Sequence, residues 1–412
     1  MQLQVLGLNY KTAPIEIREK FSVSKNSIRR GLENLAEYDG LNEAVILSTC
    51  NRTEIYAAVA DNMDSIKNFM KDLVGISDEK FFYEYIGKDC VKHLFTVAAS
   101  LDSLIIGEGQ ILSQVKEAYA LAKSVDATDT ILNTLFHKAI TVGKTVRAET
   151  KIAYNTVSVS SAAVELAEKK LNGLKDKTAL IFGAGKMARL TAQHLISHGI
   201  KKIFVANRHL ERAEDMAKDF GGIAISWESA LDNADNVDVI VTSTGAPHYV
   251  IKTWQTKQLM TRRAGRRIFF IDIAVPRDVD PDVGKIPGVT LYNIDDLESV
   301  VEDNKQARKV EAVAAEKIID EFVTATMERF KYLRFQPLMA DLSNRAEKIR
   351  EREIKRVANK LSISDDDKKI IDNMTKMIVR KLLRLPMMKL NSSAGTVEEK
   401  FYTDAVRALF RE

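Results

Sequence analysis

The sequence predicts an α/β protein of several domains: a mixed α+β block, a doubly wound parallel α/β block, and a block of helices only. Three patterns lead to this expectation. Short strands alternate with helices at the start, near-continuous apolar strands alternate with helices in the middle, and a long helical pattern without Gly or Pro follows residue 288. Because 412 residues exceed one ordinary core, we place domains at 1–150, 151–290 and 291–412.

The first block follows the order strand, helix, strand, strand, helix, strand. The expected strands are 3–10, 43–49, 54–60 and 82–86, and the expected helices are 25–38 and 65–74. This order is that of a ferredoxin-like α+β unit. Apolar residues then recur every three to four positions, which predicts a helical layer that completes the domain. The expected helices of this layer are 91–106, 110–125 and 130–150.

The second block carries a nucleotide-binding signature. After a helix over 157–171, an apolar strand begins at residue 178, and the stretch GAGKMA follows it and opens a helix. The pattern G-x-G-x-x-A in this setting is typical of a Rossmann-type domain, in which the helix N-terminus faces the phosphates. A glycine turn without a ligand is the alternative. The residues expected to bind the dinucleotide are Gly183, Ala184, Gly185, Lys186, Met187 and Ala188.

The next strand of this block favours NADPH over NADH. An NAD enzyme usually ends this strand with Asp or Glu, which holds the ribose hydroxyls, whereas this chain has Asn207 and Arg208. An arginine suits a 2′-phosphate, and the missing carboxylate removes a charge that would repel it. A solvated surface position is the alternative for Arg208.

The third block predicts one long helix that begins at Asp295 or Asp296 and continues toward Pro337. A helix of about forty residues is far longer than the usual three or four turns, and it needs something to pack against. The remaining residues, 338–412, are again helical. We therefore expect an all-α dimerisation domain and a homodimer.

Composition narrows the class of protein. With 45% hydrophobic and 29% charged residues the chain is neither disordered nor fibrous, and a net charge of +4 neither demands nor excludes a polyanionic partner. Two cysteines suit a reducing compartment, and no apolar run approaches the roughly 18 residues of a membrane span. The histidines show no metal-ligand spacing. We expect a cytoplasmic protein without a bound metal.

Cys50 is the candidate nucleophile. It lies at the turn between two predicted strands, and Arg52 two residues later could favour the thiolate. The ordinary alternative is a small buried hydrophobic residue, which is the role we expect for Cys90. A thiolate together with NADPH suggests capture of an acyl group as a thioester and its reduction to an aldehyde.

Two long motifs, STCNRTEIY and HLFTVAASLDSLIIGEGQILSQVKEAY, resemble glutamyl-tRNA reductase, the enzyme that starts tetrapyrrole synthesis from glutamate by the C5 pathway. Shorter motifs extend the resemblance, in order, over nearly the whole chain. It implies reduction of glutamyl-tRNA to glutamate-1-semialdehyde with Cys50 as nucleophile, and a polarising or proton-donating role for His93. The implied substrate contacts are Thr49, Asn51, Arg52, Ser103, Glu108, Gly109, Gln110 and Gln114.

Other readings stay open from the sequence. GAGKMA and VANRHLERAE also resemble shikimate-dehydrogenase-type domains, so an NADP-dependent oxidoreductase of a small acid is the alternative function. An RNA-binding regulator with a vestigial nucleotide fold is a third. The stretch GEGQ replaces the GEPQ of many bacterial members, so a processed enzyme of the plastid stroma is the alternative to a bacterial one. The aminomutase that consumes the semialdehyde is a possible docking partner.

Overall fold

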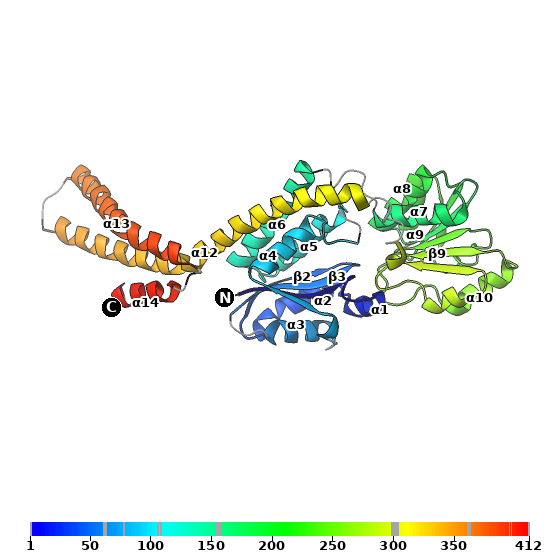
Figure 1. Ribbon diagram of the computed structural model, residues 1–412, viewed down its shortest axis with the longest axis horizontal. Coiled ribbons are helices and arrows are strands. Elements are labelled where there is room, and N and C mark those ends of the chain that lie inside the picture. The colour runs from blue at the N-terminus through cyan, green and yellow to red at the C-terminus, as the bar shows by residue number, and fades with distance from the viewer. Residues whose placement is uncertain are drawn as a thin grey trace. The chain divides into compact units, whose positions relative to one another are not determined.

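The computed structural model describes residues 2–60, 64–76, 79–104, 107, 109–150, 152, 158–297, 305–360, 364–394, 396 and 398–410. It divides into two compact units, 1–322 and 323–412. The first unit contains two sheets, and the second is helical (Figure 1). Among the described residues, no helix combines the length and the apolar character that crossing a membrane requires.

The N-terminal part of the first unit is an antiparallel sheet with the order β2-β3-β1-β4. Its strands are β1 (Gln2–Asn9), β2 (Leu41–Ser48), β3 (Arg52–Val59) and β4 (Tyr83–Ile86). Helices α2 (Lys25–Glu33) and α3 (Asp64–Val74) cover one face, and α4 (Lys88–Ala98), α5 (Gln110–Ser124) and α6 (Thr130–Glu149) cover the other (Figure 1). Every residue of β3 is buried because both faces are covered. The predicted ferredoxin-like order is confirmed.

One expected helix is shorter than the pattern suggested. The apolar spacing predicted a helix over 91–106, but α4 ends at Ala98. Ser100 has a φ of +64°, a left-handed conformation that an α-helix does not continue through, and the Leu101 amide closes the end on the Thr96 carbonyl at 3.0 Å. Asp102 and Ser103 therefore lie in a turn rather than on a helix. Residues 105 and 106 lie outside the described residues.

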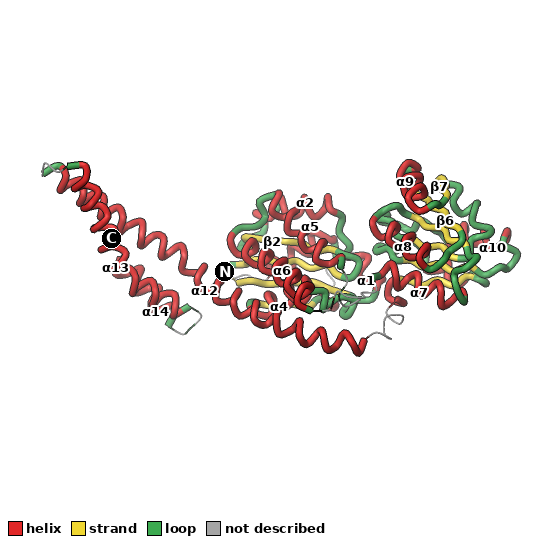
Figure 2. Tube along the Cα trace, turned by 90° about the horizontal axis from the view of Figure 1, so that it is seen from above, coloured by secondary structure: helices red, strands yellow, loops and turns green. Residues whose placement is uncertain are grey.

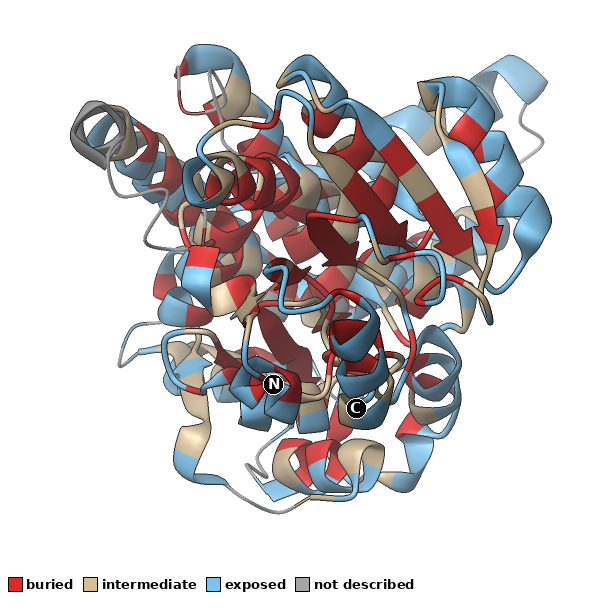
Figure 3. Ribbon diagram, turned by 90° about the vertical axis from the view of Figure 1, so that its right-hand side faces the viewer, coloured by how far each residue is buried: buried red, intermediate tan, exposed pale blue. Residues whose placement is uncertain are grey.

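A six-stranded parallel sheet forms the second part of this unit, with the order β10-β9-β8-β5-β6-β7. The strands are β5 (Thr178–Phe182), β6 (Lys202–Asn207), β7 (Ile223–Ser226), β8 (Val239–Thr242), β9 (Ile268–Asp272) and β10 (Val289–Asn293). This is the order of a Rossmann-type sheet, as predicted. Helices α7 (Val159–Leu171), α8 (Lys186–Ser197) and α9 (Leu210–Phe220) pack on one face, and α10 (Thr253–Arg262) packs on the other. Figure 2 shows the strands lying between helices, and Figure 3 shows that much of their length is buried.

Short helical turns connect these elements. The segment that leaves β1 forms α1 (Ile15–Arg18) and η1 (Glu19–Phe21) and contacts the turn that carries Cys50. The remaining turns are η2 (Leu35–Glu37), η3 (Glu79–Phe81), η5 (Pro281–Lys285) and η6 (Ile294–Leu297). The helix expected over 25–38 is therefore divided into α2 and η2.

The long helix differs from its prediction at both ends. Its expected start at Asp295 or Asp296 lies in η6, and residues 298–304 lie outside the described residues. The described helix α12 (Lys305–Ala358) has 54 residues and continues through position 337. A proline removes one backbone hydrogen bond from a helix, but it does not end this one.

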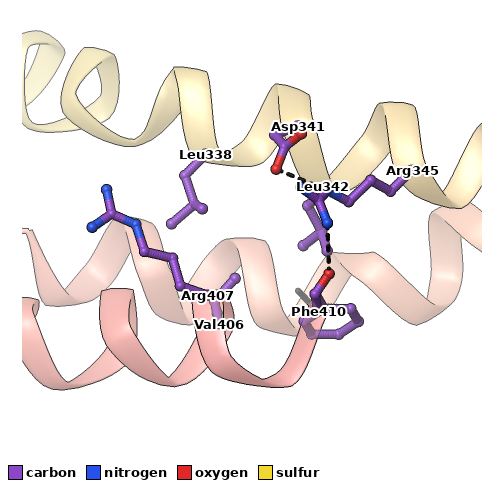
Figure 4. Close-up of a pocket in the computed structure, with 7 residues that line it drawn as sticks. All are labelled: Leu338, Asp341, Leu342, Arg345, Val406, Arg407 and Phe410. Atoms are coloured by element: carbon purple, nitrogen blue, oxygen red, sulfur yellow. Dashed lines mark hydrogen bonds and ion pairs between the residues drawn. The ribbon is translucent and has the colours of Figure 1, made fainter. Parts of the chain in front are cut away.

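In the second unit, helices α13 (Asp365–Ser393) and α14 (Glu399–Phe410) pack with the C-terminal part of α12. Figure 4 shows α14 against α12, where Arg345 donates to the Phe410 carbonyl at 3.0 Å and pairs with Asp341 at 3.0 Å. The buried core of this unit is Phe335, Met339, Leu342, Leu383, Leu390, Ala394 and Val406. An all-α C-terminal part is therefore confirmed.

Candidate active site at a cysteine-bearing turn

Cys50 lies at the turn between β2 and β3. The turn closes by a hydrogen bond from the Thr49 amide to the Arg52 carbonyl at 2.8 Å. The Thr49 hydroxyl accepts from the amides of Asn51 at 3.1 Å and Arg52 at 3.2 Å, so this side chain shapes the turn. Cys50 itself is partly buried and packs against the core of the nucleotide domain. The thiol is thus held where the two parts of the first unit meet.

Arg18 supports this turn from behind, in a role that the sequence did not predict. Its side chain is almost fully buried, and its guanidinium donates to the Cys50 carbonyl at 3.0 Å and to Asn51 Oδ1 at 3.4 Å. It also pairs with Asp295 of η6. No local pattern in the sequence marks Arg18, because all of its partners are distant along the chain.

A pocket of about 160 Å³ opens beside Cys50. Most of the residues expected to contact substrate line it, together with apolar groups from the nucleotide domain. Its lining is Thr49, Cys50, Asn51, Arg52, Ser103, Gln110, Ile111, Gln114, Val159, Met187 and Ile273. Residues of the predicted cysteine turn, of the helix α5 and of the first turn of α8, directly after the glycine turn, therefore meet in one cavity.

The turn before α5 is placed by a second arginine. Gly109 is the N-cap residue of α5, and its carbonyl accepts from Arg147 at 3.2 Å. Arg147 also donates to the Ser100 hydroxyl at 3.1 Å. Gln110 then reaches across to the nucleotide domain, with its amide nitrogen 3.0 Å from the Met187 sulfur. Glu108, an expected substrate contact, lies outside the described residues.

Arg52 is engaged by carboxylates of the protein itself. Its Nη1 lies 2.7 Å from Glu54 Oε1 and 3.0 Å from Asp102 Oδ2, and its Nη2 donates to the Asp102 carbonyl. Lys11 pairs with Asp102 on the other side. The guanidinium that was expected to contact the substrate therefore already has two anionic partners. Among the described residues, its buried Nε has no hydrogen-bond partner.

The Glu54 carboxylate is the centre of this buried network. Besides Arg52, it accepts from the Tyr56 hydroxyl at 2.6 Å and from the Tyr83 hydroxyl, and it lies 2.9 Å from His93 Nε2. Burial alone would raise the pKa of Glu54, but the charge of Arg52 and the contacts of His93 hold that pKa well below its usual range. Burial would lower the pKa of Arg52, but Glu54 together with the other acidic groups around it raises that pKa above its ordinary value. Both groups are therefore ionised.

His93 does not line the pocket that contains Cys50. It lines a separate hollow of about 370 Å³, together with Lys11, Tyr83, Tyr85 and Asp102 among others. Hydrogen bonds connect the imidazole to the cysteine pocket through Glu54 and Arg52. This placement suits an indirect effect on the reaction better than contact with the reacting atoms.

The glycine turn has the geometry of a phosphate-binding loop. Gly183 has a φ of +115°, and a Cβ there would lie 2.9 Å from the Ser243 carbonyl oxygen. Gly185 caps α8, and a Cβ built there would meet no described atom within 4 Å. Glycine at 185 is therefore not required by packing, and its open approach to the helix N-terminus fits a pyrophosphate. Ala188 is fully buried against the sheet, whereas Lys186 begins α8.

Asn207 and Arg208 lie at the end of β6, where the ribose of a dinucleotide is held in this fold. Asn207 Oδ1 accepts from the His209 amide at 2.9 Å. The exposed Arg208 lies 5.6 Å from the centre of the Trp227 ring and 3.5 Å from His248 Nε2. Arg208 forms no ion pair with a carboxylate among the described residues, although its charge acts on the nearby Asp278. Its guanidinium borders this edge of the sheet.

The surroundings of Cys90 are those of a structural residue. Cys90 is fully buried in α4, and burial raises the pKa of its thiol well above the usual range. In the described part of the chain, no group of three or more His, Cys, Asp or Glu side chains is arranged to hold a metal ion.

A Rossmann-type domain whose first turn of α8 shares a pocket with a cysteine from a second domain defines a class: an oxidoreductase with a nicotinamide-type cofactor domain and a separate catalytic domain. Family models agree with each part. Residues 6–150 match the glutamyl-tRNA reductase N-terminal domain, 165–300 match shikimate/quinate 5-dehydrogenase, and 314–412 match the glutamyl-tRNA reductase dimerisation domain.

Full-length relatives narrow the class to one family. Glutamyl-tRNA reductases of Pelotomaculum thermopropionicum and Desulforudis audaxviator are each 43% identical to this chain, covering 100% of it and 94% of their own length. The structure of glutamyl-tRNA reductase from Methanopyrus kandleri covers 99% of this chain and 98% of its own, with 35% identity and a TM-score of 0.53. The chain belongs to the glutamyl-tRNA reductase family.

Proposed function

We propose that this protein reduces glutamyl-tRNA to glutamate-1-semialdehyde with NADPH and releases tRNA, which is the first step of the C5 pathway of tetrapyrrole synthesis. The observation that carries the proposal is the pocket in which Cys50 and Met187 both take part. It joins a nucleophile to the helix start that would bind the cofactor. The family of the chain supports the substrate.

Cys50 is the nucleophile in this scheme. Its thiolate attacks the carbonyl carbon of the glutamyl ester, a C–S bond forms, and the C–O bond to the tRNA ribose breaks as the leaving oxygen takes a proton. The glutamyl group is then held as a thioester on Cys50. When bound, NADPH supplies the hydride that brings the thioester carbon to the aldehyde level. Cleavage of the C–S bond then returns the Cys50 thiolate.

For the cofactor, the glycine turn and the N-terminus of α8 would hold the pyrophosphate. Gly185 leaves the approach open, and Lys186 begins the helix. Arg208, without a carboxylate partner among the described ion pairs, would bind the 2′-phosphate that distinguishes NADPH from NADH. Asn207 would shape the turn beside it through its bond to the His209 amide.

For the substrate, the polar lining of the pocket supplies the contacts. Asn51, Gln110 and Gln114 offer amide donors and acceptors, and Thr49 and Ser103 lie at the same rim. By family resemblance we also assign substrate contacts to Gly109, the N-cap residue of α5, and to Glu108, which lies outside the described residues. A substrate carboxylate at Arg52 would bind its Nε or compete with Asp102, because Glu54 and Asp102 already occupy the other face.

His93 keeps a role in activity, but as a positioning residue. It holds Glu54, and Glu54 holds Arg52 at the pocket wall. A proton donor to the substrate would need to reach the reacting atoms, whereas His93 lines the other hollow.

Unit 323–412 supports the proposed homodimer. Helix α13 buries one stripe in the core of this unit and leaves a second apolar stripe exposed, with side chains between 49% and 72% accessible. Such a stripe is expected to pack against a second copy of the chain. The residues of the exposed α13 stripe are Ile370, Met374, Met377, Ile378, Leu382, Leu385 and Met388. Transfer of the aldehyde to an aminomutase, and a cytoplasmic location, belong to the same proposal.

The direct test is incubation with charged glutamyl-tRNA and NADPH, followed by detection of the semialdehyde. Cys50→Ser should abolish reduction, because serine offers no comparable nucleophile at neutral pH, while NADPH binding persists. Cys90→Ser is the matched control and should keep most of the activity. No semialdehyde from the unaltered protein, together with reduction of a free small acid such as dehydroshikimate, would replace this function by the alternative.

A further inference from the structure

The segment 15–21, which follows β1, carries three charged side chains that bind groups on both sides of the cysteine pocket. Glu16 and Glu19 bind the nucleotide domain, and Arg18 binds the cysteine turn. All three side chains belong to α1 and η1, a stretch of only seven residues. This short helical piece of chain therefore links the position of the nucleotide domain to that of the cysteine turn.

Arg277 is the nucleotide domain's half of this contact. It follows β9 in the loop after Pro276, and only 8% of the residue is exposed. Its Nη2 and Nε lie 2.8 Å and 3.0 Å from the two carboxylate oxygens of Glu19, and its Nη1 lies 2.9 Å from Glu16. The backbone amide of Arg277 also donates to Glu19 at 3.3 Å. A forked pair of this kind fixes direction as well as distance.

The loop that carries Arg277 begins at the pocket itself. Ile273, four residues earlier, lines the cavity beside Cys50. On the other side of the segment, Arg18 binds the Cys50 carbonyl and pairs with Asp295, which follows β10. The strands β9 and β10 are neighbours in the parallel sheet, with Ile271 opposite Tyr292. The cysteine turn is therefore tied to the carboxyl ends of two adjacent strands, which is the edge where a Rossmann-type sheet holds its ligand.

We propose that Glu19, Arg277 and Arg18 form an ionic clasp that sets the position of Cys50 relative to the nicotinamide end of the cofactor site. The inference rests on the proposed function and deepens it, because it assigns positioning residues to the hydride-transfer step alone. An apolar contact would join the two domains at a lower desolvation cost, but it would let one domain slide against the other. The forked Glu19–Arg277 pair resists such sliding because its two hydrogen bonds have fixed directions.

The clasp has a consequence that can be separated from simple loss of stability. The Cys50 thioester has two fates: hydride reduction, which consumes NADPH and gives the semialdehyde, or attack by water, which gives glutamate and the free thiol. Hydride transfer needs the nicotinamide within reacting distance of the thioester carbon, whereas water needs no such alignment. A displacement of about 1 Å can cost a reaction on the order of 10²-fold. Breaking the clasp should therefore shift the partition from semialdehyde toward glutamate.

The test uses the full-length protein, charged glutamyl-tRNA and saturating NADPH, with both products measured in the same reaction. Glu19→Gln and Arg277→Gln should lower the ratio of semialdehyde to glutamate by about 10- to 100-fold. Without NADPH, glutamate release should stay within about twofold of the unaltered protein, and NADPH affinity measured by fluorescence should not change. Arg18→Lys should shift the ratio in the same direction, because a lysine cannot bind the Cys50 carbonyl and Asp295 in the same fork.

Two further variants make the result decisive. The exchange Glu19→Arg with Arg277→Glu, combined with Glu16→Gln so that the new carboxylate does not face a second one, restores an ion pair of opposite order. It should recover part of the lost product ratio if the pair acts by joining the domains. Arg266→Gln is the matched control, because Arg266 pairs with Asp238 at 2.7 Å inside the nucleotide domain, and its ratio should be unaltered.

The possible failures are distinguishable. If the unaltered protein yields no semialdehyde from charged tRNA, the proposed function fails. If it yields semialdehyde but Glu19→Gln and Arg277→Gln keep the same product ratio, the clasp is wrong. An equal loss of both products in these variants, with the ratio preserved, would likewise show that the pair serves stability only.

Discussion

Glu54→Gln removes one charge from a fully buried network, and the structure allows its cost to be worked out. The side chain is 0% exposed and lies 2.7 Å from Arg52, 2.9 Å from His93 and 2.6 Å from the Tyr56 hydroxyl. Glutamine has nearly the same shape, so the change leaves no cavity, and the Tyr56 hydroxyl can rotate to accept from the new amide. What is lost is half of the negative charge around Arg52. Breaking a buried pair in this way costs about 3–5 kcal/mol.

The pH dependence of this effect has a definite sign. Burial would raise the pKa of Glu54, but the charge of Arg52 together with the contacts of His93 and Tyr56 outweighs burial and holds that pKa well below its usual range. The stabilisation is therefore present above the ordinary pKa of a glutamate, 4.5, and is lost only as the pH falls toward the much lower value in the folded state. The difference between Glu54→Gln and the unaltered protein should be constant from neutral pH down to about pH 5.

Urea unfolding followed by both tryptophan fluorescence and circular dichroism can assign the loss of stability to the N-terminal domain. Both tryptophans of the chain, Trp227 and Trp254, lie in the nucleotide domain. Their fluorescence therefore reports the unfolding of that domain, whereas circular dichroism reports the unfolding of the whole protein. Several transitions are expected in a protein of this size, so the midpoint assigned to the N-terminal sheet is the quantity to compare.

A surface pair provides the control for this measurement. Glu117→Gln makes the same chemical change in a pair with Lys25 at 2.9 Å whose side chains are both well exposed, and it should cost at most about 1 kcal/mol. If Glu54→Gln moved the N-terminal transition no further than Glu117→Gln, the buried network would contribute nothing beyond a surface ion pair, and the role given to Glu54 would be refuted.

Three further predictions concern the cofactor, the dimer and pH. Arg208→Glu should weaken NADPH binding far more than NADH binding in fluorescence titrations, because it repels the 2′-phosphate; an unchanged preference would place Arg208 outside the site. Leu385→Asp, at a position 72% exposed on α13, should give a monomer in sedimentation velocity, whereas Val313→Asp, 67% exposed on α12, should not. Burial and the nearby Asp278 raise the pKa of Asp272 from 3.8 to about 7. The folded state therefore holds the Asp272 proton more tightly than the unfolded state, and the nucleotide domain loses stability as the pH rises between these two values. Asp272→Asn should flatten that dependence in thermal unfolding followed by fluorescence.

Local patterns were sufficient to predict the elements and their order. Alternating and continuous apolar runs predicted both sheets, because the period of side chains along a strand reflects which faces are covered. The glycine turn was found because backbone geometry requires Gly183, whose φ is +115°. Cys50 was found because a polar turn between two buried strands is an unusual place for a thiol. Each of these signals lies within a few residues of chain.

Features that depend on tertiary contacts were not predictable in the same way. Arg18 and Arg277 were missed because their carboxylate partners Asp295 and Glu19 lie more than 250 positions away along the chain. The end of α4 was missed because the apolar spacing continues past Ala98, although the chain turns at Ser100. The continuation of α12 through position 337 was missed because a proline is a local signal for the end of a helix, whereas this helix continues. Its packing outweighs the one backbone hydrogen bond that a proline removes.

The most direct test of the central claim is mass spectrometry of the Cys50 peptide after mixing the protein with charged glutamyl-tRNA in the absence of NADPH. A glutamyl group on Cys50, lost on mild treatment with hydroxylamine and converted to semialdehyde when NADPH is added, is the predicted result. Reduction of glutamyl-tRNA by a protein that never carries glutamate on Cys50, or that carries it on Cys90, would contradict the proposed chemistry.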